Sequence, residues 1–451
     1  MNLKNYIRSI AIPYSSVLFF LLTLLFGRPF MGLNLFGFRV GEYLVGIAFL
    51  SSIILLSNKN LVNIFFEKNT YLITYLIFIY TFLYILINYK SIFNTYTYKY
   101  SSYIWLLSYI FLGGVLVKYL KFNFRHLIIL NFTLLGTYIL SAVYYPEFII
   151  NFFKIYSDKF DFLKASDILV TFVLTVFLNN RYLNKKYKYS NEYFFLLCAF
   201  FLPLFIYKSR GATIAVAIFI LLEFLQIKKT INFSVPKRIF IAVICILLFY
   251  LSSYLMVDAE VEYNEILNSD VISELLETKN TSVESFLSFY LIKNIDDLMA
   301  FNFLDDGRIF SSDGNINFRL QIWQDVLLDS FENDRIFFGV GFFEKIPVMN
   351  NGWYAGADGK NESVHNYFFN IYARGGLIHL VLFIVFYWYL FKSSKKIIGN
   401  NDLIIFSTPL LVVSMFDASM STPHFPFLFS LCIGCILINM GVDLNKDKRL
   451  K

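Results

Sequence analysis

Four side chains near predicted membrane boundaries could carry out chemistry in this chain. His365 and Asn366 stand where a long acidic loop meets an apolar segment. An imidazole exchanges its proton near neutral pH, so His365 could take a proton from a hydroxyl group. Arg210 and Arg319 fall in loops predicted to face the same side of the membrane, and guanidinium groups bind phosphate with paired N–H donors. The combination predicts a site that binds an anionic lipid-linked donor and deprotonates an acceptor.

His365 is expected at the amino end of a helix, where the helix dipole disfavours an imidazolium and keeps the ring able to accept a proton. The alternative is that His365 only caps or hydrates the helix end. Arg210 follows Lys208 in a very short turn and opens an apolar segment. Its guanidinium and the free N–H groups of that helix could bind a phosphate together. The alternative for Arg210 is an arginine that extends into lipid headgroups.

Arg319 lies four residues before Trp323 in a loop rich in acidic residues. A salt bridge with Asp313 or Asp325 is the alternative to substrate binding for this arginine.

Arg374 lies eight residues beyond Asn366, beside Gly375-Gly376, within an apolar segment. Eight residues correspond to about 12 Å along a helix. A guanidinium at that depth needs a partner or a polar cavity. Arg374 therefore either adds to substrate binding or pairs with an acid on another helix, for which Asp417 is the candidate.

The elements that must position these residues are membrane helices. Hydrophobic residues make up 57% of the chain and charged residues 16%, against roughly 25% charged residues in ordinary soluble domains. Apolar runs of about 17 to 20 residues, long enough to cross a bilayer, recur along the whole chain. We predict an all-α polytopic integral membrane protein with about twelve transmembrane helices. The predicted spans are 9–26, 40–57, 70–88, 102–118, 126–144, 166–181, 192–207, 210–227, 239–256, 366–391, 403–420 and 425–441.

The distribution of positive charge predicts how the chain is oriented. If the amino terminus is cytoplasmic, loops on that side carry 22 of the 39 Lys and Arg residues, and the opposite short loops carry nine. Cytoplasmic loops are enriched in Lys and Arg, so both termini are expected in the cytoplasm. The net charge of +7 then mostly reflects topology, and no nucleic-acid partner is indicated.

A large acidic external loop separates two parts of the predicted membrane bundle, giving regions 1–256, 257–364 and 365–451. Apolar spacing within this loop predicts one helix over 266–276 and a second over 318–331, capped by Asn315 or Asn317. Glycines in 338–343 predict a bend back toward the membrane. A long loop with helices of its own is more often functional than a passive connector, so we expect a partly helical lid.

Metal chemistry and cysteine chemistry are not favoured. Asp296-Asp297 and Asp305-Asp306 could bind a divalent ion, but they lie far from His365 in sequence. All four cysteines fall in predicted spans, and Cys432-x-x-Cys435 has no histidine or acid nearby, which favours helix packing. We therefore expect no metal and no cofactor.

Three short motifs resemble the superfamily of O-antigen polymerases and O-antigen ligases (Wzy and WaaL). They are Arg319-x3-Trp323, then Phe338-Gly339-Val340-Gly341, then His365-Asn366-x9-Gly376. The order of these motifs, the large loop between late spans and the arginine that opens an earlier span strengthen the resemblance.

The resemblance implies an inverting, metal-independent glycosyltransferase at the outer, periplasmic face of the bacterial inner membrane. Its donor would be an undecaprenyl-diphosphate-linked oligosaccharide, its other partners membrane lipids and a chain-length regulator. His365 would act as the base, Arg210 and Arg319 would hold the diphosphate, and Asn366 would orient groups nearby. Lys208 and Arg374 are further candidates for substrate binding.

Three functions remain as alternatives. The stretch Ala373–Ile378 favours a polymerase, which moves a growing glycan onto a lipid-linked repeat unit. A ligase would move the finished glycan onto lipid A–core instead. A flippase or transporter could also have twelve spans, but no internal repeat relates the first six spans to the last six.

Overall fold

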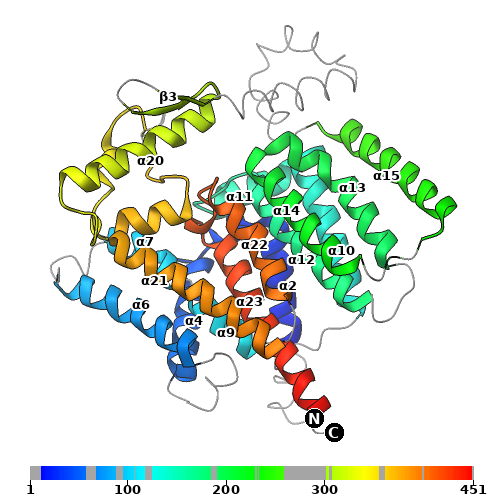
Figure 1. Cartoon of the computed structure of the whole chain (residues 1–451), viewed down its shortest axis with the longest axis horizontal. Coiled ribbons are helices and arrows are strands. Elements are labelled where there is room, and N and C mark those ends of the chain that lie inside the picture. Colours follow the sequence, from blue (N-terminus) through cyan, green and yellow to red (C-terminus); the bar gives the residue numbers. More distant parts are fainter. Residues whose placement is uncertain are drawn as a thin grey trace.

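Helices dominate the architecture of the chain (Figure 1). The structure is a computed structural model, and it describes residues 12–56, 68–87, 95–105, 107–116, 124–183, 190–228, 231, 233–257, 301–303, 307–354, 361–398 and 401–448. The predicted helix over 266–276 and the paired aspartates Asp296-Asp297 and Asp305-Asp306 lie outside the described residues.

Within the described residues, five helical stretches are long and apolar enough to cross a membrane: Phe124–Val143, Ser190–Lys208, Arg210–Ile227, Val235–Leu255 and Tyr367–Lys395. Six shorter apolar stretches of 10–17 residues accompany them. The prediction of a helical membrane protein is therefore confirmed in this coarser form, while the number of twelve crossings stays a prediction.

Each of the twelve predicted apolar segments overlaps a helix. The segments correspond in order to α2 (Ile12–Phe26), α4 (Val40–Leu56), α6 (Lys68–Ile87), α8 with α9 (Ser102–Trp105 and Ser108–Leu116), α10 (Phe124–Tyr138), α12 (Ala165–Leu183), α13 (Ser190–Lys208), α14 (Arg210–Ile227), α15 (Val235–Leu255), α21 (Tyr367–Ile398), α22 (Asp402–Ser414) and α23 (His424–Lys448).

Three of these segments differ from simple spans. The fourth is broken between α8 and α9, and the fifth ends in a π-helical turn, Ile139–Val143. The eleventh was predicted to run to residue 420, but α22 ends at Ser414. This correction moves Asp417 out of the membrane helix and into the turn that follows.

The all-α prediction needs two small corrections. Strands β1 (Asn34–Leu35) and β2 (Phe38–Arg39) form one antiparallel hairpin, and β3 (Phe301–Phe303) pairs with β4 (Ile309–Ser311) in another. A short helix absent from the predicted elements, α11 (Glu147–Tyr156), precedes α12. These elements lie in the connections between apolar helices, where hydropathy carries little information.

Close helix packing holds the centre of the bundle together. Helix α9 packs against both α4 and α23. A Cβ atom on Gly113 of α9 would lie 2.1 Å from the Leu431 carbonyl oxygen, and one on Gly434 of α23 would lie 1.9 Å from that of Ile110. Only glycine fits at these two positions, as expected where helix backbones approach within a membrane protein.

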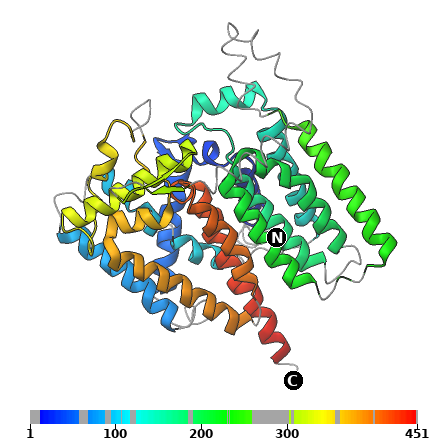
Figure 2. The same ribbon diagram turned by 45° about the horizontal axis from the view of Figure 1, so that its top comes forward.

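The remaining helices surround this centre in two groups (Figures 1 and 2). Helix α6 packs along α21 on one side. Helices α10, α12, α13, α14 and α15 follow one another on the other side, and α22 packs against α14 and α12. Helix α20 (Gly314–Glu332) lies over one end of the bundle together with β3 and β4 (Figure 1).

The glycine-rich bend at 338–343 docks on a break in α21, as predicted for a segment that returns toward the membrane. The break lies at Gly376, whose φ of 68° favours glycine. Across it, Val340 N–H donates to Ala373 O (2.8 Å) and Leu377 N–H donates to Ile336 O (2.8 Å). Backbone groups that lose their partners at the break thus bond to the loop.

Arg374 holds this docked segment in place. Its side chain is fully buried, and its Nη1 donates to the carbonyl oxygens of Gly341 (3.1 Å) and Glu344. The guanidinium also lies over the Tyr100 ring, 3.6 Å from the ring centroid. The ion pair with Asp417 considered as an alternative does not form, because Arg374 bonds to backbone oxygens instead.

Replacing Arg374 with alanine should destabilise the protein by about 3 kcal/mol, because two buried carbonyl oxygens lose their charged donor. The midpoint of thermal unfolding in detergent measures this effect. Arg335→Ala is the matched control, since Arg335 is partly exposed and, among the described residues, forms one ion pair, with Asp329 at 3.3 Å. Equal shifts for the two variants would refute the role assigned to Arg374.

Candidate active site

Helix α20 carries one wall of the candidate site and is fixed at its start and along its length. Asp313 caps it, with Oδ1 accepting from Ile316 N–H at 2.8 Å, so the predicted caps Asn315 and Asn317 are wrong. The predicted helix over 318–331 is confirmed. A small apolar cluster that includes Ile322, Val326 and Ala373 joins α20 to α21.

Two aromatic residues of α20 fix the segment that bears His365. The Trp323 indole Nε1 donates to Val364 O at 2.8 Å, and its ring stacks on Phe369, with centroids 5.3 Å apart. The Phe318 ring meets the imidazole of His365 edge-on, with centroids 6.0 Å apart. The motif Arg319-x3-Trp323 therefore places an arginine next to the residue that anchors the histidine segment.

His365 lies just before its helix and not within it. Helix α21 begins at Tyr367, and Asn366 caps it, because Asn366 Oδ1 accepts from Phe369 N–H at 3.0 Å. His365 itself has a φ of 52°, and its N–H donates to Ser363 Oγ at 3.1 Å. This left-handed backbone turns the imidazole out of the helix line, and Asn366 holds the turn.

Arg210 belongs to the same end of the bundle. Ser209 caps α14, with its Oγ accepting from Ala212 N–H at 3.4 Å, and Arg210 is the first helical residue. The Arg210 Nη1 lies 2.7 Å from Asp313 Oδ2, so the cap of α20 also receives this arginine. The pairing with Asp313 that was considered for Arg319 is thus made by Arg210.

Arg319 is half-buried and makes no ion pair or hydrogen bond with the residues that the structure describes. Asp325, its other expected partner, pairs with Arg308 at 2.7 Å. Burial lowers the pKa of Arg319, and the nearby carboxylates of Asp417 and Asp313 oppose that effect. The guanidinium is therefore held near acids but is not neutralised by contact with one, which leaves its donors available to a ligand.

Asp417, which the sequence suggested only as a partner for Arg374, lies instead close enough to His365 and Arg319 to affect their pKa values. Its Oδ2 accepts from Ser166 Oγ at 2.7 Å, and its Oδ1 accepts from Ala418 N–H at 2.7 Å. Lys164 lies near it: burial opposes the charge of Lys164, but Asp161 and Asp417 raise its pKa. Lys164 was predicted just before a span on the side of His365, but Asp417 was predicted inside the eleventh span, which concealed its place in a turn near His365.

The charges around His365 set its protonation state. Desolvation lowers its pKa most, the positive charge of Arg319 lowers it further, and Asp417 partly opposes both. The resulting pKa of about 4 makes the imidazole neutral at pH 7. The predicted neutral state is the same, but its causes are burial and Arg319, not the helix dipole alone.

The structure thus brings Arg210, Arg319 and His365 to one end of the bundle, linked through Asp313 and Asp417. Lys208, the last residue of α13, lies two positions from Arg210 at that end. Arg374 is different: it is buried beneath the docked loop and bonds to that loop. Its geometry favours a structural role over contact with a substrate.

Residues 194–384 match the family model described as O-antigen ligase. The predicted superfamily resemblance is confirmed. The match covers less than half of the 451-residue chain, and among curated proteins none matches it. The matched segment contains Arg210, Arg319 and His365, whereas Asp417 and Lys164 lie outside it.

The candidate site was expected to work without a metal ion. Among the described residues, no group of three or more His, Cys, Asp or Glu side chains could hold one. All four cysteines, which lie in described helices, are free, as expected for packing residues.

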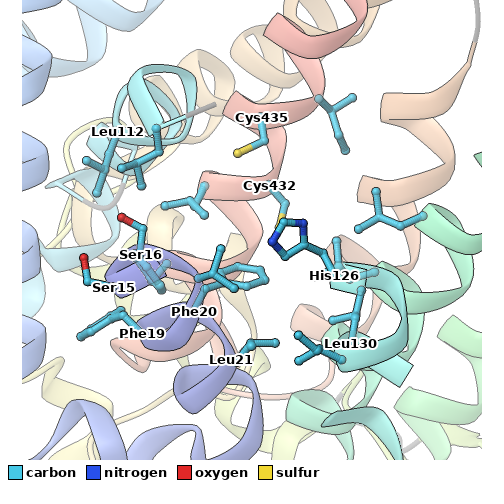
Figure 3. A pocket seen from close by; sticks show the side chains of 18 of the residues that line it. Ser15, Ser16, Phe19, Phe20, Leu21, Leu112, His126, Leu130, Cys432 and Cys435 are labelled. Carbon is cyan, nitrogen blue, oxygen red and sulfur yellow. The ribbon is translucent and has the colours of Figure 1, made fainter. Parts of the chain in front are cut away.

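A cavity of about 500 Å³ lies inside the bundle between α2, α4, α9, α10, α12 and α23 (Figure 3). Its lining is almost wholly apolar, with His126, Ser15, Ser16 and Arg181 among the few polar residues. None of the residues grouped around His365 lines it. The cavity suits a hydrocarbon chain and not a sugar phosphate, so it is separate from the candidate active site.

Proposed function

We propose that the chain is a membrane glycosyltransferase that takes a glycan from an undecaprenyl-diphosphate carrier, with inversion and without a metal ion. The observation that carries the proposal is a neutral imidazole at His365 together with Arg319, whose guanidinium has no ion-pair partner among the described residues, inside a segment that matches the O-antigen ligase family. A base beside an anion-binding group is what glycosyl transfer from a diphosphate requires.

In the proposed reaction, the acceptor hydroxyl oxygen attacks the anomeric carbon while its proton passes to His365. The bond between that carbon and the diphosphate oxygen breaks, and its electron pair stays on the diphosphate. Arg319 and Arg210 stabilise the charge that develops there, each through charge-assisted hydrogen bonds. The energy comes from the sugar–diphosphate bond, so no nucleotide or cofactor enters the reaction.

Donor binding would also improve His365 as a base. The charge of Arg319 lowers the pKa of His365 to about 4 together with burial. A diphosphate bound at Arg319 would neutralise that charge and raise the pKa of His365 toward neutrality, where general bases work best. Proton transfer would thus be favoured only when the donor is in place.

For the acceptor, we propose a lipid-linked repeat unit, which makes the enzyme a polymerase with its site facing the periplasm and both termini in the cytoplasm. The family description favours the second candidate, a ligase that uses lipid A–core. The stretch Ala373–Ile378 does not decide between them, because it forms the buried helix break and bonds to the docked loop.

The purified protein should convert an undecaprenyl-diphosphate-linked repeat unit into a ladder of longer lipid-linked glycans in the presence of EDTA. Gel separation of the labelled products measures this. Transfer of glycan only when lipid A–core is added would make the chain a ligase. Movement of the lipid across vesicle membranes with no new glycosidic bond would refute the proposed enzyme and favour a transporter.

A further inference from the structure

Trp353 is a large, exposed aromatic residue near the candidate active site, and the proposed reaction does not use it. Trp353 exposes 60% of its surface, whereas its neighbour Tyr354 exposes 3%. A single exposed tryptophan is not unusual, but one near a reacting group can serve a substrate. The hydrogen bonds of its turn and the side chains next to it indicate whether Trp353 has such a role.

The turn that carries Trp353 is fixed by hydrogen bonds. Trp353 N–H donates to Asn351 Oδ1 at 3.1 Å, and Tyr354 N–H donates to Asn351 O at 3.0 Å. The Tyr354 hydroxyl donates to Asp325 Oδ2 at 2.5 Å, and Asn361 Nδ2 donates to Tyr354 O at 2.9 Å. The indole is therefore presented from a hydrogen-bonded turn.

A continuous row of rings joins Trp353 to the proposed base. The Trp353 and Phe318 centroids are 6.0 Å apart, and the Phe318 and His365 centroids are also 6.0 Å apart. If a sugar hydroxyl reached His365, that sugar or the next sugar of the same chain would lie over these rings.

We infer that Trp353 and Phe318 form a stacking platform for the sugar rings of the acceptor glycan, a role that rests on the proposed function. A pyranose ring has an apolar face of C–H groups and a polar edge of hydroxyls. The indole offers a flat apolar surface for the face. The amide groups of Asn351 and Asn361 offer donors and acceptors for the edge.

The surroundings of Trp353 favour a sugar over a lipid surface as its occupant. Two asparagines fix its turn, and the Asp325 carboxylate beneath the turn pairs with Arg308. A tryptophan that anchors a protein in a bilayer presents its apolar body to hydrocarbon next to other apolar side chains. Polar neighbours of this kind are instead typical of binding sites that combine aromatic and hydrogen-bonding groups.

Steady-state kinetics of Trp353→Ala test the inference. The fixed donor is a carrier lipid that bears polymer, and the varied acceptor is a single repeat unit on a short, water-soluble prenyl diphosphate. We expect the KM for the acceptor to rise about tenfold, with kcat and the KM for the donor nearly unchanged, as when a buried aromatic contact is truncated. Trp353→Phe, which keeps a ring, should retain most of the affinity.

Trp388→Ala is the matched control, because Trp388 exposes 67% of its surface on α21 and should leave both KM values unchanged. An unchanged acceptor KM in Trp353→Ala would overturn the platform. If kcat fell and both KM values changed alike, Trp353 would instead anchor the predicted lid. The same conclusion would follow if less of the variant protein than of the parent protein stayed in vesicles. The parent protein separates the two ideas: if it forms no new glycosidic bond with these substrates, the proposed function fails whatever Trp353 does.

Discussion

Replacing His365 should lower glycan transfer by about 10²- to 10⁴-fold, the usual contribution of a general base. Among the described histidines, His365 is the one near Arg319, an arginine without an ion-pair partner among the described residues. Its pKa of about 4 leaves His365 neutral and able to accept a proton at pH 7. The loss should appear in kcat, because the donor is held by the arginines. Single-turnover transfer with labelled donor measures the chemical step directly.

The choice of substitution matters because His365 has a φ of 52°. An alanine at that position would add backbone strain to the loss of the imidazole, whereas asparagine and glycine tolerate a left-handed backbone. His365→Asn and His365→Gly should therefore keep the thermal unfolding midpoint of the parent while losing transfer. His126→Ala, in the separate apolar cavity, is the control and should remain active. Normal chain lengthening by His365→Asn would exclude His365 as the base.

Much of the fold follows from hydropathy alone. Every predicted apolar segment falls on a helix, because a run of apolar residues in a membrane protein must satisfy its own backbone hydrogen bonds. Helix α20 is also predictable, since Leu320, Trp323, Val326 and Leu327 recur at helical spacing. Hydropathy fails at helix ends: it extends α22 past Ser414 and misses α11, whose position depends on surrounding loops.

The site is predictable in its residue types but not in its pairings. His365, Arg210 and Arg319 stand out as ionisable groups at membrane boundaries. Which acid meets which arginine depends on how loops pack, and no spacing rule predicts it.

Asp313 illustrates the point, because it both caps α20 and receives Arg210. Arg374 also shows that the partner of a charged group cannot be predicted from the sequence. Its depth suggested a charged partner, but carbonyl oxygens of the loop that docks on the helix break accept hydrogen bonds from the guanidinium instead.

Replacing Arg319 should weaken the reaction and also change its dependence on pH. Arg319→Met removes one hydrogen-bonding side chain from the diphosphate, and loss of such a hydrogen-bond donor typically lowers kcat by about 10²- to 10³-fold. It also removes a positive charge that lowers the pKa of His365, so that pKa should rise from about 4 toward the ordinary value.

The protonated imidazole cannot act as a base, so activity falls as the pH drops through the pKa of His365. In the parent enzyme, this acid limb of kcat/KM should lie near pH 4, and in Arg319→Met it should lie at higher pH. Arg319→Lys keeps the charge but not the paired donors, so it should lose donor affinity while its acid limb stays near that of the parent. Profiles of kcat/KM against pH for the three proteins separate the two effects. An acid limb at the same pH in all three would mean that Arg319 does not act on His365, and that the base and the phosphate-binding group do not share one pocket.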